Sequence, residues 1–145
     1  MTFGKRTLRD THPYGVLDVR HIMIKSSNIG MAQIGFKCGA DLLYEKLSSF
    51  GFGTPTGIEL PGEIGGILRP RKAWCDYSVG SVSMGQEIAC TCLQLACGFA
   101  IFANNGFLVK PTIVVSGRGS YGTQQAGGDD VEGIPPVKVL SDRTV

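Results

Sequence analysis

The chain has 145 residues, of which 43% are hydrophobic and 18% are charged, and its 14 basic and 12 acidic residues leave a formal net charge of +2. This composition is typical of one globular domain and excludes a disordered tail. The near balance of charge, without a long run of Lys or Arg, argues against a nucleic-acid partner.

Neither a targeting signal nor a membrane segment is visible. Residues 2–9 alternate basic and polar side chains and lack the apolar core of a signal peptide. The longest apolar stretch, residues 93–103, is about half of the roughly 20 residues that span a bilayer, and it predicts a buried helix instead.

Three helices are predicted in the first third of the chain. Apolar spacing indicates a short helix over residues 16–25, with Asp18 in its first turn, where a carboxylate favours the helix dipole. A second helix is predicted from Ile29 to Phe36, ending near Gly39, and a third over residues 40–50. The third helix has an apolar side formed by Leu42, Leu43, Leu47 and Phe50.

The junction between the first two helices reads Lys25-Ser26-Ser27-Asn28-Ile29-Gly30. A hydroxyl at Ser26 can relay a proton, and the carboxamide of Asn28 can orient a base or bind a carbonyl oxygen. The simpler interpretation is that Ser26 or Ser27 caps the following helix, and the tripeptide alone favours capping.

Residues 51–75 are predicted to be rich in loops because glycines and prolines recur through them, with short strands around 57–60 and 66–68. Trp74 and Tyr77 are expected to pack in the core or under a loop. Gln86 and Glu87 precede an apolar helix, where a capping or bracing role is favoured over acid–base catalysis.

That apolar helix is predicted over residues 91–105, followed by strands over 107–116, weakened at its centre by Pro111, and 136–140. Residues 117–136 are expected to form a flexible loop. Its start, Gly117-Arg118-Gly119-Ser120-Tyr121-Gly122, fits the Gly-x-Gly-x-x-Gly pattern of dinucleotide-binding loops. The glycine-rich sequence that follows cannot supply the required helix, so a nucleotide site is rejected.

The cysteines predict neither a disulfide framework nor a metal site. They are odd in number and contain no Cys-x-x-Cys pair, and the two histidines do not complete a ligand set. Free buried thiols are expected. The positions are Cys38, Cys75, Cys90, Cys92 and Cys97.

Several ordered passages form a pattern more specific than any single motif. They are Asp10 to Gly15, Lys25 to Gly30, Leu43 to Leu47, Phe50 to Gly53, Thr56 to Glu63, Met84 to Ala89, Leu93 to Ala96, Ala103 to Gly106 and Val109 to Pro111. Together they resemble the transpeptidase domain of class B high-molecular-weight penicillin-binding proteins, the cross-linking enzymes of cell division and elongation. One departure is Cys92, where the family has proline at the first helical position, and the fold is expected to tolerate it.

The resemblance implies an α+β fold of the penicillin-binding protein and β-lactamase type, with helices packed on an antiparallel sheet. Residues 1–145 would be a partial transpeptidase domain, truncated at both ends and mostly its helical lobe. Of the three motifs of this enzyme class, the chain contains only Ser-x-Asn, at Ser26-Ser27-Asn28: no serine begins Ser-x-x-Lys and no lysine is followed by Thr-Gly. We therefore expect the nucleophile to lie elsewhere in the full-length protein and this chain alone to be inactive.

By resemblance, the full-length protein is a serine D,D-transpeptidase that cross-links peptidoglycan stem peptides and is acylated by β-lactams. Ser26 would relay the proton, and Asn28 would position substrate and lysine. No metal or organic cofactor is implied. The expected partners are stem peptide, β-lactams and division or elongation complex proteins, and the expected location is the cell envelope, with the full-length protein anchored in the membrane.

Two other functions remain open at this stage. One is a non-catalytic module that binds cell-wall or division partners and needs no nucleophile. The other is a β-lactamase-related serine hydrolase, which the Phe50 to Gly53 and Gly85 to Glu87 passages make less favoured. Ser-x-x-Lys upstream and Lys-Thr-Gly downstream in the flanking sequence would indicate the enzyme.

Overall fold

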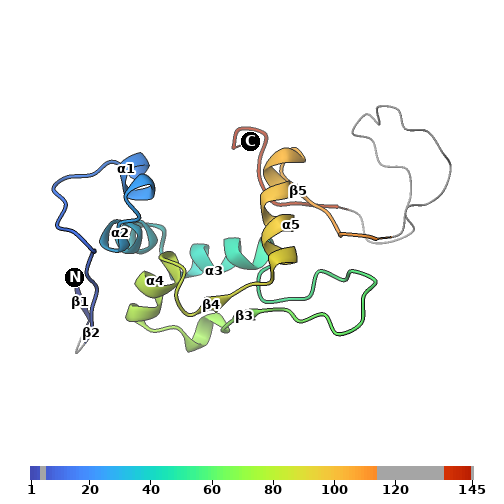
Figure 1. Ribbon diagram of the computed structural model, residues 1–145, viewed down its shortest axis with the longest axis horizontal. Helices are drawn as coiled ribbons and strands as arrows, with labels where there is room; N and C mark the ends of the chain where they lie inside the picture. The colour runs from blue at the N-terminus through green and yellow to red at the C-terminus, as the bar shows by residue number, and fades with distance from the viewer. Residues whose placement is uncertain (4–5, 114–135, 145) are drawn as a thin grey trace.

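A computed structural model describes residues 1–3, 6–113 and 136–144. The elements in chain order are β1 (Thr2–Phe3), β2 (Arg6–Thr7), α1 (Val19–Ile24), α2 (Asn28–Cys38), α3 (Ala40–Ser49), β3 (Ile67–Leu68), the short 3-10 helix η1 (Arg71–Ala73), α4 (Asp76–Ser83), β4 (Ile88–Ala89), α5 (Cys92–Ala103), β5 (Phe107–Leu108) and β6 (Val137–Lys138). Helices α1 to α4 form one group, and α5 with β5 lies at the other end of an elongated molecule (Figure 1).

Helix α2 is the centre of the helical group and packs most extensively against α4. Small residues allow the two helices to approach closely. A Cβ atom added at Gly35 would lie 1.7 Å from Ser83 Oγ, and one added at Gly80 would lie 3.3 Å from the Ala32 side chain. Ala32, Val79 and Val82 are buried at this contact. The core of the described residues therefore includes the surface between α2 and α4.

Helix α4 was not expected from the sequence, because its residues are weak helix formers. Ser78, Val79, Gly80, Ser81 and Val82 include two β-branched residues and a glycine, and all of them are buried. Helical stability in proteins comes largely from tertiary packing, which overrides weak local propensity. Packing against α2 therefore accounts for this helix.

Helix α5 begins at Cys92, one residue later than predicted, and forms despite the missing proline. Its N-cap is Thr91, whose hydroxyl accepts from Gln94 N at 3.1 Å, while Gln94 Oε1 accepts from Thr91 N at 2.9 Å. This reciprocal capping box satisfies two backbone donors that would otherwise be unpaired. The capping box thus offsets the pre-organisation lost with proline.

The Gln94 side chain also fastens the loop that precedes β3. It is 1% exposed, and its Nε2 donates to the carbonyl oxygens of Gly51, Thr54 and Gly65. Buried polar groups of this kind are stable only when paired. One side chain therefore links the start of α5 to both ends of the loop between α3 and β3.

Three two-stranded antiparallel ladders complete the described fold. In them Thr2 pairs with Thr7, Ile67 with Ala89, and Phe107 with Lys138. Helices combined with antiparallel strands agree with the predicted α+β class. The β1–β2 ladder and β4 were not predicted from the sequence.

Several predicted boundaries need correction. Helix α1 begins at Val19, three residues later than expected, because Asp18 is its N-cap and accepts from His21 N at 2.7 Å. No strand forms at residues 57–60. Of the strand predicted over 107–116, the structure describes residues 107–113, and within these only β5, before Pro111, is paired. Leu42 is exposed rather than packed. Residues 117–135, including the Gly117 to Gly122 motif, lie outside the described residues.

The cysteines are free, but only Cys97 is buried, so the expectation of buried thiols is wrong for Cys38, Cys75, Cys90 and Cys92. In the described part of the chain, no three His, Cys, Asp or Glu side chains gather in a way that could hold a metal ion. Among residues 1–3, 6–113 and 136–144, no helix is both long and apolar enough to cross a bilayer.

Candidate functional site

Ser26 occupies the turn that ends α1. Its N–H donates to Met23 O at 3.2 Å, and the next N–H, from Ser27, donates to Ile22 O at 3.0 Å. This pair of bonds is the Schellman arrangement, in which the residue after the C-cap adopts the left-handed conformation and is usually glycine. Ser26 has φ of 50° and is exposed. A hydroxyl-bearing residue therefore stands where glycine would be less strained.

Ser27, the middle residue of the motif, is the N-cap of α2. Its Oγ accepts from Gly30 N at 2.9 Å and donates to Asp10 Oδ2 at 2.8 Å, and its side chain is almost fully buried. The other carboxylate oxygen of Asp10 accepts from Ile29 N at 3.0 Å. The capping interpretation is thus confirmed for Ser27, and Ser26 and Asn28 flank this cap.

Asn28 is the first residue of α2 and is half-buried. Its Nδ2 donates to Arg9 O at 3.2 Å, which ties the amide to the chain just before Asp10. The approach of α1 to α2 behind it requires Gly30, because a Cβ atom there would lie 2.7 Å from the Ile22 side chain. We call the junction between α1 and α2, residues 25–30, the elbow. It is held by hydrogen bonds on one side and by close packing on the other.

A cavity of about 560 Å³ adjoins Asn28, and we call it the Asn28 cavity. It lies between the β2 strand with its following residues, α4 and the loop after α4. Ser26 is not among the described residues that line it. The lining consists of Arg6, Thr7, Leu8, Arg9, Asn28, Tyr77, Ser81, Met84, Gln86 and Glu87.

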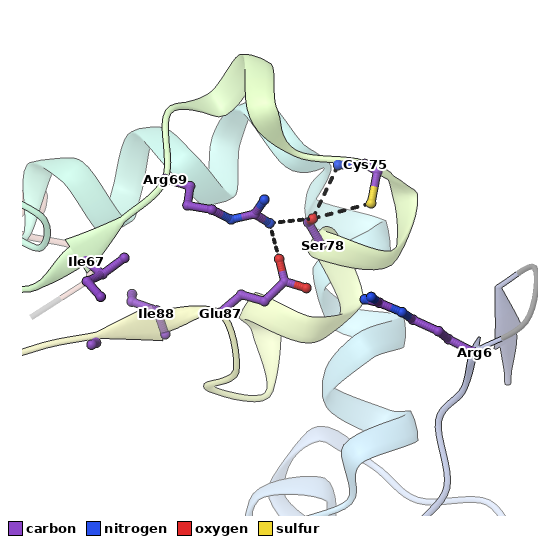
Figure 2. A pocket seen from close by; sticks show the side chains of 8 residues that line it. Arg6, Ile67, Arg69, Cys75, Ser78, Glu87 and Ile88 are labelled. Atoms are coloured by element: carbon purple, nitrogen blue, oxygen red, sulfur yellow. Dashed lines mark hydrogen bonds and ion pairs between the residues drawn. The ribbon is translucent and has the colours of Figure 1, made fainter.

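A second cavity, of about 650 Å³, shares Arg6 and Glu87 with the first, and we call it the Arg69 cavity. Figure 2 shows the guanidinium of Arg69 directed at the Glu87 carboxylate and at Ser78. Glu87 has φ of 58°, so it too adopts the left-handed conformation. The bracing role expected of Glu87 is confirmed, because its ion pair joins the chain after β3 to the chain before β4 and to α4. Gln86, in contrast, is exposed.

Cys75 lies at the start of α4 on the wall of the Arg69 cavity (Figure 2). The Ser78 hydroxyl accepts from Arg69 Nη2 at 2.9 Å and from Cys75 N at 3.2 Å. With both acceptor positions used, its hydrogen is left for Cys75 Sγ, 3.5 Å away. This hydrogen bond is the main reason that the pKa of the exposed Cys75 thiol lies below its ordinary value of 9.0.

The junction between α1 and α2 was therefore predicted from the sequence, but the residues that hold it in place were not. Ser26 and Asn28 lie on either side of the Ser27 cap, and only Asn28 reaches a described cavity. Asp10 lies within the Asp10 to Gly15 passage, but the sequence indicates no role for it, because its partners lie 17 and 19 residues away. The Arg69–Glu87 pair carried no signal either, since its members are 18 residues apart.

Comparison with known proteins connects this geometry to a family. Residues 4–134 match the model described as "Penicillin binding protein transpeptidase domain". The chain is 35% identical over 114 residues to the probable peptidoglycan D,D-transpeptidase PbpC of Pseudomonas aeruginosa, covering 79% of this chain and 20% of the relative. It is 31% identical over 112 residues to the peptidoglycan D,D-transpeptidase MrdA of Salmonella typhimurium, covering 71% of this chain and 18% of the relative.

Solved structures agree. The chain matches penicillin binding protein 3 of Mycobacterium tuberculosis, solved in complex with aztreonam, with a TM-score of 0.81 and 27% identity, covering 99% of this chain and 32% of that one. The chain spans about a fifth of the length of the curated relatives it matches. The family model covers most of the chain and the relatives exceed 30% identity, so the chain belongs to the penicillin binding protein transpeptidase domain family.

Proposed function

We propose that this chain is part of a penicillin-binding D,D-transpeptidase that cross-links peptidoglycan stem peptides through a serine acyl-enzyme. The observation that carries the proposal is the match of residues 4–134 to the transpeptidase domain. Two of the matching relatives are named peptidoglycan D,D-transpeptidases. Residues 1–145 would then be a partial domain, with the nucleophile supplied by a segment outside this chain.

In the proposed reaction, a serine Oγ attacks the carbonyl carbon between the two D-alanines of a stem peptide. The peptide C–N bond breaks, and the leaving D-alanine takes a proton. An amine of a neighbouring stem then attacks the ester, restores the serine hydroxyl and completes the cross-link. In this scheme the Ser26 hydroxyl relays the proton to the leaving nitrogen, and the Asn28 carboxamide holds the substrate carbonyl and the activating lysine.

Two structural features support these roles. Ser26 retains a left-handed conformation that costs conformational energy for any residue with a Cβ atom, and such strain clusters at active sites. Asn28 lines a cavity large enough for part of a peptide, while one of its amide hydrogens is engaged by Arg9 O. Its remaining donor and its oxygen are available for a substrate among the described contacts.

The remaining proposals concern partners and location. Stem peptide and β-lactams are the proposed ligands, consistent with the aztreonam and ampicillin complexes of the M. tuberculosis relative. The cell envelope is the proposed location, with membrane anchoring and division or elongation complexes as properties of the full-length protein.

Acylation by a labelled penicillin tests the function. The full-length protein is expected to gain one covalent adduct on intact-mass measurement, whereas the isolated 145-residue chain should gain none. Ser26→Ala and Asn28→Ala in the full-length protein should slow acylation, because each removes a group from the reacting atoms, and Gln33→Ala on the exposed side of α2 serves as the control.

Three results would contradict the proposal. A stable adduct on the isolated chain would show that the nucleophile lies within these residues. A folded full-length protein that binds cell-wall fragments but forms no adduct would indicate a non-catalytic binding module. Rapid hydrolysis of the labelled penicillin, without an accumulating adduct, would indicate a β-lactamase-like hydrolase.

A further inference from the structure

Asp10 makes contacts that neither the motif nor helix capping alone requires. Its half-buried carboxylate accepts from Ser27 Oγ at 2.8 Å and from Ile29 N at 3.0 Å. The neighbouring Arg9 carbonyl accepts from Asn28 Nδ2. Three successive residues of the elbow, Ser27 to Ile29, are thus each hydrogen-bonded to the pair Arg9-Asp10.

The two carboxylate bonds complete the hydrogen bonding of the elbow. Ser27 already caps α2 by accepting from Gly30 N, so its own hydrogen needs an acceptor, and Asp10 supplies it. Ile29 N is one of the first-turn donors without an intrahelical partner. A carboxylate at this end of the 11-residue α2 also has a favourable interaction with the helix dipole.

These bonds determine how the elbow is oriented. With its hydroxyl both donating and accepting, Ser27 has no free rotation, and it lies between Ser26 and Asn28 in the chain. The first turn of α2 is held to residues 9 and 10, which also border the Asn28 cavity through Arg9. The directions in which the Ser26 and Asn28 side chains leave the backbone therefore depend on the Asp10 carboxylate.

We propose that Asp10 is a positioning residue for acylation, acting through Ser27 and the first turn of α2 on the Ser26 hydroxyl and the Asn28 amide. This inference rests on the proposed transpeptidase function. Misplacement of a reacting group by about 1 Å can lower a rate up to about 100-fold. Loss of the carboxylate should therefore slow the chemical step rather than only the stability of the fold.

The test uses Asp10→Asn in the full-length protein. The amide keeps one acceptor oxygen, but its nitrogen can only donate, so either the bond from Ile29 N is lost or the bond with Ser27 Oγ is reversed and Ser27 no longer donates to a carboxylate. Acylation by a fluorescent penicillin, followed at increasing concentration, yields the limiting rate constant, the half-saturating concentration and the fraction of protein labelled. We expect a limiting rate constant lowered about 10- to 100-fold, a smaller change in the half-saturating concentration, and an unchanged labelled fraction.

The matched control is Thr91→Ala, which removes a side-chain cap from α5, away from the elbow. It should lower the thermal midpoint without altering the limiting rate constant. If Asp10→Asn does not fold, Ser27→Ala breaks the same Asp10 contact from the other side and should lower the same rate constant. Where both fold, the double variant should be slower by less than the product of the two single effects, because the two residues share one hydrogen bond.

The outcomes separate the two levels of inference. A wild-type-like limiting rate constant for Asp10→Asn, whether alone or with a lower thermal midpoint as in Thr91→Ala, would overturn the positioning role while leaving the transpeptidase function intact. Failure of the wild-type full-length protein to be acylated would overturn the proposed function, and the positioning role with it.

Discussion

A serine in the left-handed turn after α1 costs conformational energy that a glycine would avoid. The Schellman bonds around Ser26 fix this conformation regardless of the side chain. For residues with a Cβ atom the left-handed conformation costs roughly 1–2 kcal/mol. This cost supports the proposed use of the Ser26 hydroxyl.

Ser26→Gly should separate stability from activity. We expect the free energy of unfolding of the full-length protein to rise by about 1 kcal/mol, since glycine relieves the left-handed strain but is more flexible when unfolded. Penicillin acylation should fall, because the hydroxyl is lost. Urea denaturation and adduct formation measure the two effects. Ser26→Ala is the control, with slower acylation but no gain in stability, and a destabilised glycine variant would contradict the strain argument.

Cys75 and Cys97 should differ in reactivity. Hydrogen bonding from Ser78 lowers the pKa of the Cys75 thiol, whereas burial raises that of Cys97. Because the thiolate is the reactive form, iodoacetamide at neutral pH should modify Cys75 well before Cys97. Peptide mass spectrometry after timed alkylation measures this. Ser78→Ala should slow Cys75 several-fold at pH 7 and shift its pH–rate curve upward; an unchanged curve would exclude the Ser78 hydrogen bond as the cause.

At the residue scale, sequence reasoning reached the residues of the motif and no further. Ser26 and Asn28 belong to a recognisable Ser-x-Asn pattern, and the capping role of Ser27 follows from its type and place. The left-handed φ of Ser26 could not be predicted, because it depends on where α1 ends. Asp10 could not be assigned, because its bonds join segments distant in sequence.

At the element scale, the loop between α3 and β3 is stabilised by one carboxylate. Glu63 accepts from Thr56 N and Thr56 Oγ1, each at 2.6 Å, and from Gly57 N at 2.9 Å. The hydrogen bond from the Thr56 side chain is the main reason that its pKa lies below the ordinary value of 4.5. Thr54 and Gly65 of the same loop are held by Gln94.

The pH dependence of folding should report on Glu63. Because its pKa is lower in the folded state, its contribution is fully present above pH 4.5 and is lost as the pH falls through the lower folded value. Glu63→Gln should therefore be less stable than wild type at pH 7, and the difference should shrink below pH 4.5. Urea denaturation of both proteins across this range measures it. Glu45→Gln, which removes an exposed carboxylate from α3, is the control. A difference in the free energy of unfolding between wild type and Glu63→Gln that stays constant with pH would contradict the prediction.

Elements were predictable where apolar periodicity and caps agreed. Helices α2, α3 and α5 lie close to their predicted bounds, each with a clear stop at Gly39, Phe50 or Asn104. Helix α4 was missed because its glycine, serines and valines favour other conformations until α2 covers them. The pairing of β5 with β6 could not be predicted from the sequence, since it joins strands separated by a long segment.

At the scale of the whole molecule, α5 presents an apolar stripe to solvent. Leu95, Phe99 and Phe102 recur at helical spacing and are 45%, 68% and 49% exposed. Contiguous exposed apolar surface of this kind favours association. The stripe agrees with a chain that spans about a fifth of its curated relatives.

The isolated chain should therefore self-associate as its concentration rises, and Phe99→Ser should reduce this association. In the full-length protein we expect the substitution to be harmful instead. Phe99→Ser should lower the thermal midpoint there, because the stripe is covered by the rest of the protein. Sedimentation velocity and thermal unfolding measure the two. Lys72→Ser, at an exposed position of η1, is the control. A full-length protein indifferent to Phe99→Ser would indicate that the stripe stays open to solvent.

Gly30 limits how this elbow can diverge during evolution. Even one methyl group there would overlap the Ile22 side chain, so α1 would have to tilt away and carry the turn with it. Variants that alter ligand selectivity while keeping the chemistry would then arise more readily along the open rim, at positions such as Met84 and Gln86, than behind the elbow. Substitutions that alter ligand preference should therefore accumulate at the rim positions, whereas Gly30 should not vary.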